Sequence, residues 1–341
     1  MTIDTEKTMI RPLVIYRGAF FCYDFQKHVM KSIKTFAAIL LAFGLLGTAC
    51  RKSNLNHHGS IYATLAADPS YSILVAAINK EGLKATLDSK SEEDFTVFAP
   101  DNKAFAALGL SSTSALSTLP DSTLKAILLY HVLGGQVKAA DIPQATHTPV
   151  NTLNGQPAFA TRTPSGQVFI NGVPVTKADI LCTNGVIHDI SAVLLPATGT
   201  IVQTAIANPN LSLLVTAVLR ASQGSTNVAA VLSGTGPFTV FAPTNQAFIN
   251  AGFVNSAAIN AADPNTLTKI LTYHVIAGRI FSSDLVNNSM PATVNGETVH
   301  ILVGSSVQVK GNGNSTPSTV MAANIVTTNG VVHVIDQVLL P

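Results

Sequence analysis

The stretch Phe95–Pro100, which reads FTVFAP, decides the fold because the chain contains it twice. It returns as Phe238–Pro243, 143 residues later. Its β-branched and aromatic residues are typical of a buried strand, and the proline predicts where that strand ends. Asp101 and Thr244 follow, and both are residue types that cap helix N-termini. Each copy therefore predicts a buried strand that leads directly into a helix.

Two further motifs repeat in the same order, which indicates that whole domains are duplicated. Tyr-His-Val at residues 130–132 returns at 273–275, and Asn-Gly-Val at 184–186 returns at 329–331. Solenoid repeats are only about 20–50 residues long, so repeats of this length can each carry a core of their own. We predict one domain at residues 59–196 and a second at residues 199–341.

Helical patterns come first in each copy, and strand patterns follow them. Ile61–Lys80 has apolar residues at helical spacing, with a break at Asp68-Pro69. Asn154-Gly155 and Asn295-Gly296 are hairpin signals that introduce short β segments. Each copy is therefore expected to contain both helices and strands.

Both copies of the tyrosine–histidine motif end a predicted amphipathic helix. Apolar residues and the histidine recur at i, i+3, i+4 and i+7, which places His131 and His274 on the buried face. Burial favours the neutral form, so we interpret both histidines as structural hydrogen-bonding residues. Tyr130 and Tyr273 lie one step off this stripe, and we expect them at the rim of the core.

Other repeated polar residues also favour structural roles. Asn102 and Asn245 follow the repeated strand, where an amide can bond backbone groups at the strand-to-helix corner; surface recognition is the alternative. His188 and His333 belong to the closing motif, and we interpret them as structural as well. Asp189 follows His188, but the second copy has a valine there, so the two copies share no histidine–carboxylate pair.

The sequence predicts no enzyme. It contains no Gly-x-Ser-x-Gly, no His-Glu-x-x-His and no phosphate-binding glycine loop. We therefore predict no catalytic residue, no cofactor and no metal site. Charged residues make up 11% of the chain and the formal net charge is +2, without a basic stripe, so nucleic acid is not expected as a partner.

The N-terminal region predicts export. Residues 30–49 have a short basic start, an apolar stretch and small residues before Cys50, as in a secretory signal peptide. Cys50 in this position resembles the lipidated cysteine of a bacterial lipoprotein, which would anchor the chain to a membrane; an ordinary signal peptide is the alternative. We interpret residues 1–29 as an extension before the true start, and residues 50–58 as a flexible tether.

The three motifs together resemble the fasciclin domain. The resemblance rests on Phe-Thr-Val-Phe-Ala-Pro-x-Asn-x-Ala-Phe, then Tyr-His-Val, then Asn-Gly-Val-(Ile/Val)-His and a terminal Val-Leu-Leu-Pro, and it covers about residues 59–196 and 199–341. It implies an α+β fold, with a β-wedge of two sheets and packed helices in each of two tandem domains. It also implies adhesion outside the cell and contacts with extracellular matrix or surface proteins.

The resemblance adds a second interpretation of the tyrosine–histidine motif. In animal members this region has been associated with receptor binding, which would make Tyr130-His131 and Tyr273-His274 contact sites for a partner. We expect a non-catalytic adhesion or protein-interaction protein at the cell surface or in the periplasm. The alternative is a lipoprotein that binds small ligands or glycans, although aromatic residues make up only 6% of the chain and tryptophan is absent.

Overall fold

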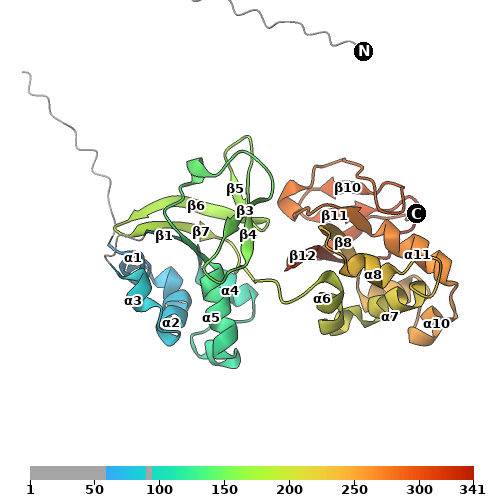
Figure 1. The fold of residues 1–341 in the computed structure, drawn as a ribbon, viewed down its shortest axis with the longest axis horizontal. Helices are drawn as coiled ribbons and strands as arrows, with labels where there is room; N and C mark the ends of the chain where they lie inside the picture. Colours follow the sequence, from blue (N-terminus) through green and yellow to red (C-terminus); the bar gives the residue numbers. More distant parts are fainter. Residues whose placement is uncertain (1–58, 90–93) are drawn as a thin grey trace, which may run out of the picture. The chain divides into compact units, whose positions relative to one another are not determined.

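The computed structural model of the protein describes residues 59–89 and 94–341. The predicted extension, the signal peptide, Cys50 and the tether at residues 50–58 lie outside the described residues. The two repeats form two α+β domains of the same design, as the sequence predicts (Figure 1).

The first domain opens with helices that gather on one side of its sheet (Figure 1). The break predicted at Asp68-Pro69 is confirmed, since it separates α1 from α2. The helices are α1 (Ile61–Ala67), α2 (Ser72–Lys80), α3 (Lys84–Leu87), α4 (Asn102–Ala107) and α5 (Asp121–Tyr130). The strands are β1 (Phe95–Pro100), β2 (Val132–Gly134), β3 (Thr148–Asn151), β4 (Pro157–Arg162), β5 (Val168–Ile170), β6 (Val173–Cys182) and β7 (Gly185–Ile190).

The second domain repeats this order, and its helices again lie on one side of the strands (Figure 1). Its helices are α6 (Ile201–Ala207), α7 (Ser212–Ala221), α8 (Val228–Ser233), α9 (Asn245–Asn250), α10 (Ser256–Ala261) and α11 (Pro264–Tyr273). Its strands are β8 (Phe238–Pro243), β9 (Val275–Ala277), β10 (His300–Val303), β11 (Val307–Lys310), β12 (Ser318–Thr327) and β13 (Gly330–Ile335).

The strands of each domain are hydrogen-bonded in one continuous order. In the first domain the order is β2-β1-β7-β6-β5-β4-β3, and in the second it is β10-β11-β12-β13-β8-β9. The long strands β6 and β12 pair with neighbours on both sides and contain register shifts. The two sheets of the expected wedge are therefore joined through one long, irregular strand, which is where β-bulges bend a sheet.

The repeated strands β1 and β8 lie inside the sheet, and both of their faces are buried. Each pairs in parallel with the closing strand, β7 or β13, and antiparallel with the short strand after the tyrosine–histidine helix. In β1, Val97 and Ala99 belong to the core on the helical side, while Phe98 belongs to the core on the other face. Val240 and Phe241 of β8 divide in the same way. Because successive side chains of a strand point to opposite faces of the sheet, each of these strands contributes side chains to both cores of its domain.

The helix caps expected after these strands are confirmed. The Asp101 carboxylate accepts a hydrogen bond from the Ala104 amide at 2.8 Å, and the Thr244 hydroxyl accepts one from the Ala247 amide at 3.2 Å. Each bond satisfies an amide at the first turn of α4 or α9 that has no partner within its helix.

Among residues 59–89 and 94–341, no single helix is long and apolar enough to cross a membrane. Two bent pairs, α1 with residues 69–80 and α6 with residues 209–221, reach that length and composition only together.

Gly185 begins β7 at a point where a side chain has no room. It has a φ of 142°, and a Cβ atom at this position would collide with the carbonyl oxygen of Phe95 on β1. We predict that Gly185→Ala lowers the free energy of unfolding by about 1–3 kcal/mol or more, because the central strand pair must separate. Gly134→Ala on β2 is the matched control, since no atom lies within 4 Å of its added Cβ. Equal urea midpoints for the two variants would contradict this account.

Candidate functional site

The two tyrosines of the repeated motif lie in the interior. Tyr130 and Tyr273 both have 0% exposure, so the expectation that they lie at the rim is wrong. The reason is that each ring projects into the core on the far side of the sheet, where strands of the wedge cover it. The Tyr130 hydroxyl donates to the carbonyl of Pro157 at 3.1 Å and accepts from the Asn171 amide at 3.0 Å.

The histidines next to them connect a helix to the closing segment of the domain. In the first domain His131 Nδ1 lies 2.7 Å from the Ile127 carbonyl, and its Nε2 accepts from the Leu194 amide at 2.9 Å. His274 repeats this arrangement, with its Nδ1 2.8 Å from the Ile270 carbonyl and its Nε2 2.8 Å from the Leu339 amide nitrogen. A carbonyl only accepts and an amide only donates, so each ring is neutral with its proton on Nδ1.

Burial lowers the pKa of His131 and of His274 to about 4, and the bond to the helix carbonyl offsets only part of this effect. Protonation would also place a hydrogen on Nε2 facing an amide that already donates to it. Both rings therefore stay neutral near pH 7. His131 is 3% exposed and His274 is 2% exposed, so direct contact of these rings with a partner stays a prediction that requires the motif to open.

The histidines of the closing motif support the irregular point of the long strand. Nε2 of His188 donates to the Val137 carbonyl, and its Nδ1 accepts from the amide of Asp179 at 3.2 Å. Asp179 has a φ of 60°, a conformation that Asp and Asn tolerate better than most residues. His333 accepts in the same way from Asn324, which has a φ of 63°. Each ring therefore satisfies an amide that the β-ladder leaves without a partner.

The repeated asparagines bond to a helix other than the one that they begin. Asn102 on α4 accepts from the Ile73 amide at 3.0 Å and donates to the Pro69 carbonyl at 3.0 Å. Asn245 makes the corresponding bonds to the turn before α7. These amides thus satisfy backbone groups at the break between two helices, rather than at the strand-to-helix corner.

Sequence reasoning gave no role to the asparagine that begins the closing motif. Asn184 accepts from the Ile61 amide at 2.8 Å and donates to the Leu87 carbonyl at 3.0 Å, and Asn329 repeats both kinds of contact. Asn184 is 1% exposed. The signal was present in the sequence, because Asn184 and Asn329 recur at the same step of the repeat.

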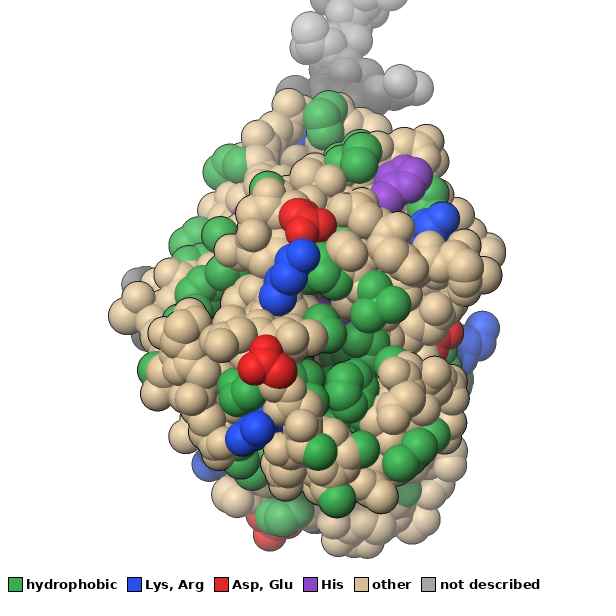
Figure 2. Space-filling view, turned by 90° about the vertical axis from the view of Figure 1, so that its right-hand side faces the viewer, with side chains coloured by type: hydrophobic (Ala, Val, Ile, Leu, Met, Phe, Trp, Pro, Cys, Tyr) green, Lys and Arg blue, Asp and Glu red, His purple; other side chains and the backbone are tan. Residues whose placement is uncertain are grey.

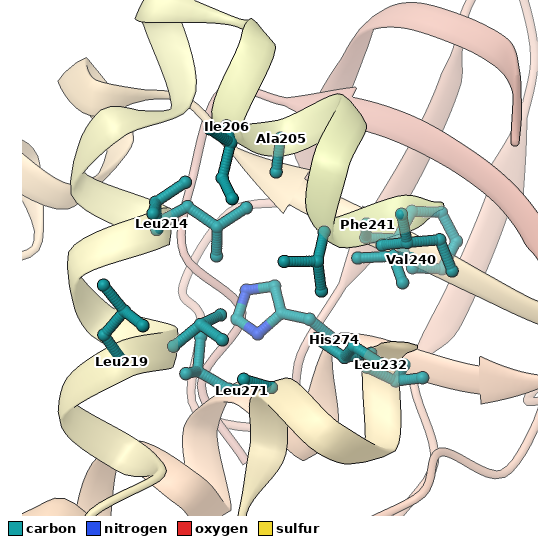
Figure 3. A pocket seen from close by; sticks show the side chains of 15 residues that line it. Ala205, Ile206, Leu214, Leu219, Leu232, Val240, Phe241, Leu271 and His274 are labelled. Carbon is teal, nitrogen blue, oxygen red and sulfur yellow. The ribbon is translucent and has the colours of Figure 1, made fainter. Parts of the chain in front are cut away.

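An apolar cavity in the second domain was also missed by sequence reasoning. It has a volume of about 80 Å³ and lies between α6, α7, α8, β8 and the end of α11. Figure 3 shows Ala205 and Ile206 on one side, Leu214 and Leu219 on another, and the ring of His274 between them. The cavity lies between the helices and the sheet.

The face of the protein seen in Figure 2 carries few charged side chains. Figure 2 shows apolar side chains gathered in the middle of one face, with isolated charged side chains around them. Several large apolar side chains are exposed, among them Ile206, Leu219 and Met321. Within residues 59–89 and 94–341, no group of three or more His, Cys, Asp or Glu side chains could hold a metal ion. Cys182 is buried, and burial raises the pKa of its thiol.

Comparison with known proteins identifies the family. The family model described as the Fasciclin domain matches residues 69–196 and again residues 210–341. The chain belongs to the fasciclin domain family. A solved FAS1 domain pair from the insect cell adhesion molecule Fasciclin I is 17% identical, with a TM-score of 0.39, and the match covers 82% of this chain and 96% of that one.

Relatives occur in animals and bacteria. Human periostin is 30% identical over 249 residues, which are 72% of this chain and 28% of periostin. Transforming growth factor-beta-induced protein ig-h3 of Sus scrofa is 26% identical over 283 residues, which are 83% of this chain and 39% of the relative. Protein sll1483 of Synechocystis is 40% identical over 144 residues, 42% of this chain and 73% of that protein. The chain thus spans roughly a third of the length of the two animal relatives.

We predict that His274→Ala lowers the free energy of unfolding by about 1–3 kcal/mol, because the buried Leu339 amide loses its acceptor. His300→Ala is the control, since His300 is only partly buried on β10 of the same domain. Urea unfolding followed by circular dichroism measures both variants. A His274→Ala protein that unfolds like the parent but loses a binding partner would favour the recognition interpretation instead.

We also predict that stability falls as the pH is lowered. Unfolded histidine has a pKa near 6.5, whereas burial holds the pKa of His131 and of His274 at about 4 in the folded state. Between these values the unfolded chain binds protons that the folded chain does not, so each ring removes up to about 1.4 kcal/mol per pH unit. Urea midpoints at pH 7.5, 6 and 5 should decrease, and less steeply in His274→Ala. A parent protein that is as stable at pH 5 as at pH 7.5 would refute this.

Proposed function

We propose that this protein is a non-catalytic adhesion or protein-interaction protein that works outside the cytoplasm. Its two fasciclin domains would present surfaces to extracellular matrix or surface proteins. One observation carries the proposal: the polar side chains that recur in both domains bond to the protein's own backbone. These repeated polar side chains therefore stabilise the fold. Contacts with other molecules are then left to the side chains on the outer surface.

The histidines illustrate why catalysis is not proposed. A general base needs a ring nitrogen that can reach a substrate. Both nitrogens of His131, His188, His274 and His333 lie within hydrogen-bonding distance of backbone groups. Neither ring nitrogen is then free for proton transfer in any of the four.

The weakly charged surface supports binding through contact area rather than long-range attraction. Exposed apolar side chains such as Val254 and Val286, at 61% and 66% exposure, can be buried against a partner surface. Two domains on one chain also allow two weak contacts to act together, which raises the overall strength of attachment. Glycans are a further class of partner in this proposal. Binding of a small apolar ligand is the alternative function, and the apolar cavity of the second domain is the observation that favours it.

Export and lipid attachment at Cys50 are part of the same proposal. They rest on the signal pattern at residues 30–49 and on the position of Cys50 directly after it. We expect that metabolic labelling with palmitate marks the parent chain, that Cys50→Ala is not marked, and that protease treatment of intact cells removes the parent. Ser53→Ala in the same segment is the matched control and should keep the label. Equal labelling of Cys50→Ala and the parent would exclude this anchor.

Adhesion itself is tested separately from the anchor. Beads coated with the full-length Cys50→Ala chain should attach to cells or to matrix proteins more than beads coated with an unrelated protein of similar charge. Attachment should persist at high salt, since few charges take part. Equal attachment of both kinds of bead would contradict the adhesion role.

A further inference from the structure

The cavity of the second domain has a filled counterpart in the first domain. Helices α6 and α7 follow α1 and α2 at an offset of 140 residues, which places Ala205 where the first domain has Leu65. Leu65 is fully buried in the core, whereas Ala205 lines the cavity. The second domain therefore lacks a side chain that the first domain uses to fill this place.

Polar groups close the same place in the first domain. The Tyr62 hydroxyl donates to Asn79 Oδ1 at 3.0 Å, and Tyr62 packs against the core. The ammonium group of Lys84 lies 4.9 Å from the centre of the Tyr62 ring, which is within the range of a cation–π contact. An aromatic ring, an amide and a cation thus cover the core between α1, α2 and α3.

The second domain replaces all three of these residues with smaller or apolar ones. At the offset of 140, Val202 stands in place of Tyr62 and Leu219 in place of Asn79. The chain between α7 and α8 is longer, so Ala229 takes the place of Lys84 at an offset of 145, the same offset that relates Leu87 to Leu232, whose carbonyls accept from the repeated asparagines. Val202, Leu219 and Ala229 all line the cavity. Ile206 and Leu219 are 63% and 59% exposed, so the rim of the cavity is apolar and open to solvent. The differences between the domains act together to open one apolar cavity.

The lining defines the chemistry of what can bind. It contains no charged side chain, and its one polar side chain is His274, whose two nitrogens already contact Ile270 and Leu339. A buried water needs two to four polar partners, which this lining does not provide, although a volume of about 80 Å³ would hold several water molecules. The cavity therefore suits a group that has neither charge nor hydrogen-bonding atoms.

We propose that this cavity binds the end of the saturated alkyl chain of a single-chain amphiphile, such as a medium-chain fatty acid dissolved in water. The chain enters past Ile206 and Leu219, and its carboxylate stays in solvent outside the apolar rim. A chain taken from water gains the full benefit of leaving water, whereas a chain taken from a bilayer leaves surroundings that are already apolar. The proposed occupant is a monomer from solution. The proposal deepens the small-ligand alternative given under the proposed function and does not depend on the adhesion role.

The test is calorimetric titration of the full-length Cys50→Ala chain, so that no attached lipid competes. The probes are butanoate, hexanoate, octanoate and decanoate below their aggregation concentrations. Affinity should rise about fourfold with each added methylene until the cavity is full, and then stop rising. Butanoate measures what the carboxylate contributes with almost no chain, and it should bind weakly or not at all.

Ala205→Leu restores the side chain that fills the first domain. It should weaken octanoate binding at least tenfold while the melting temperature stays the same or rises. Ala207→Leu makes the same substitution at an exposed position of the same helix and should bind octanoate like the parent. Leu219→Asn introduces the polar residue of the first domain at the exposed rim and should also weaken binding, so the test stands even if Ala205→Leu does not fold.

Each of the following results would overturn the proposal. The first is that no fatty acid binds up to its aggregation concentration. The second is that Leu219→Asn and every folded cavity variant bind octanoate as tightly as the parent, or that affinity does not depend on chain length. The third comes from phosphatidylcholine vesicles: if the parent sediments with them, Leu219→Asn does not, and free fatty acids do not bind, then the chain is supplied by a bilayer instead.

Discussion

Both domains are organised by a strand that is buried on both faces. Strands β1 and β8 have hydrogen-bonded neighbours on each side and apolar contacts above and below, and nearly all of their residues are buried. A backbone in this position must have every polar group paired, and its two faces must be covered by different layers. Helices cover one face and the remainder of the sheet covers the other. The parallel pairing with β7 or β13 explains why the last strand of each domain returns to its middle.

The same requirement explains the repeated polar residues. Where the chain leaves regular structure, an amide or carbonyl in the interior loses its usual partner, and a side chain takes its place. His131 does this for the closing segment, His188 for the irregular point of β6, and Asn184 for the start of α1. Histidine and asparagine are residue types that often occur in active sites, but here they form hydrogen bonds with the protein's own backbone. Their repetition reflects the fold that both domains share.

Residues that differ between the two domains therefore indicate a particular function better than the residues that both domains share. At one place between the helices and the sheet, the first domain has a leucine, a tyrosine and a lysine, and the second has two alanines and a valine. The first set closes the core and the second leaves an apolar cavity with an open rim. Because the two domains share one fold, they can be compared directly. The first domain shows how side chains fill this place, and the second shows that the fold still forms when the place is left open.

The sequence by itself determined the duplication, the presence of helices and strands in each copy, the buried strand, the capped helix after it and the inward direction of the histidines. These features depend on periodicity and on local hydrogen bonding, which neighbouring residues decide. Only the tertiary structure decided that Tyr130 is covered, because the strands that cover it come later in the chain. It also decided the partners of Asn184, which lie 123 and 97 residues away, and the existence of the cavity. A cavity is a volume that several distant side chains leave unfilled, so no single stretch of sequence contains it.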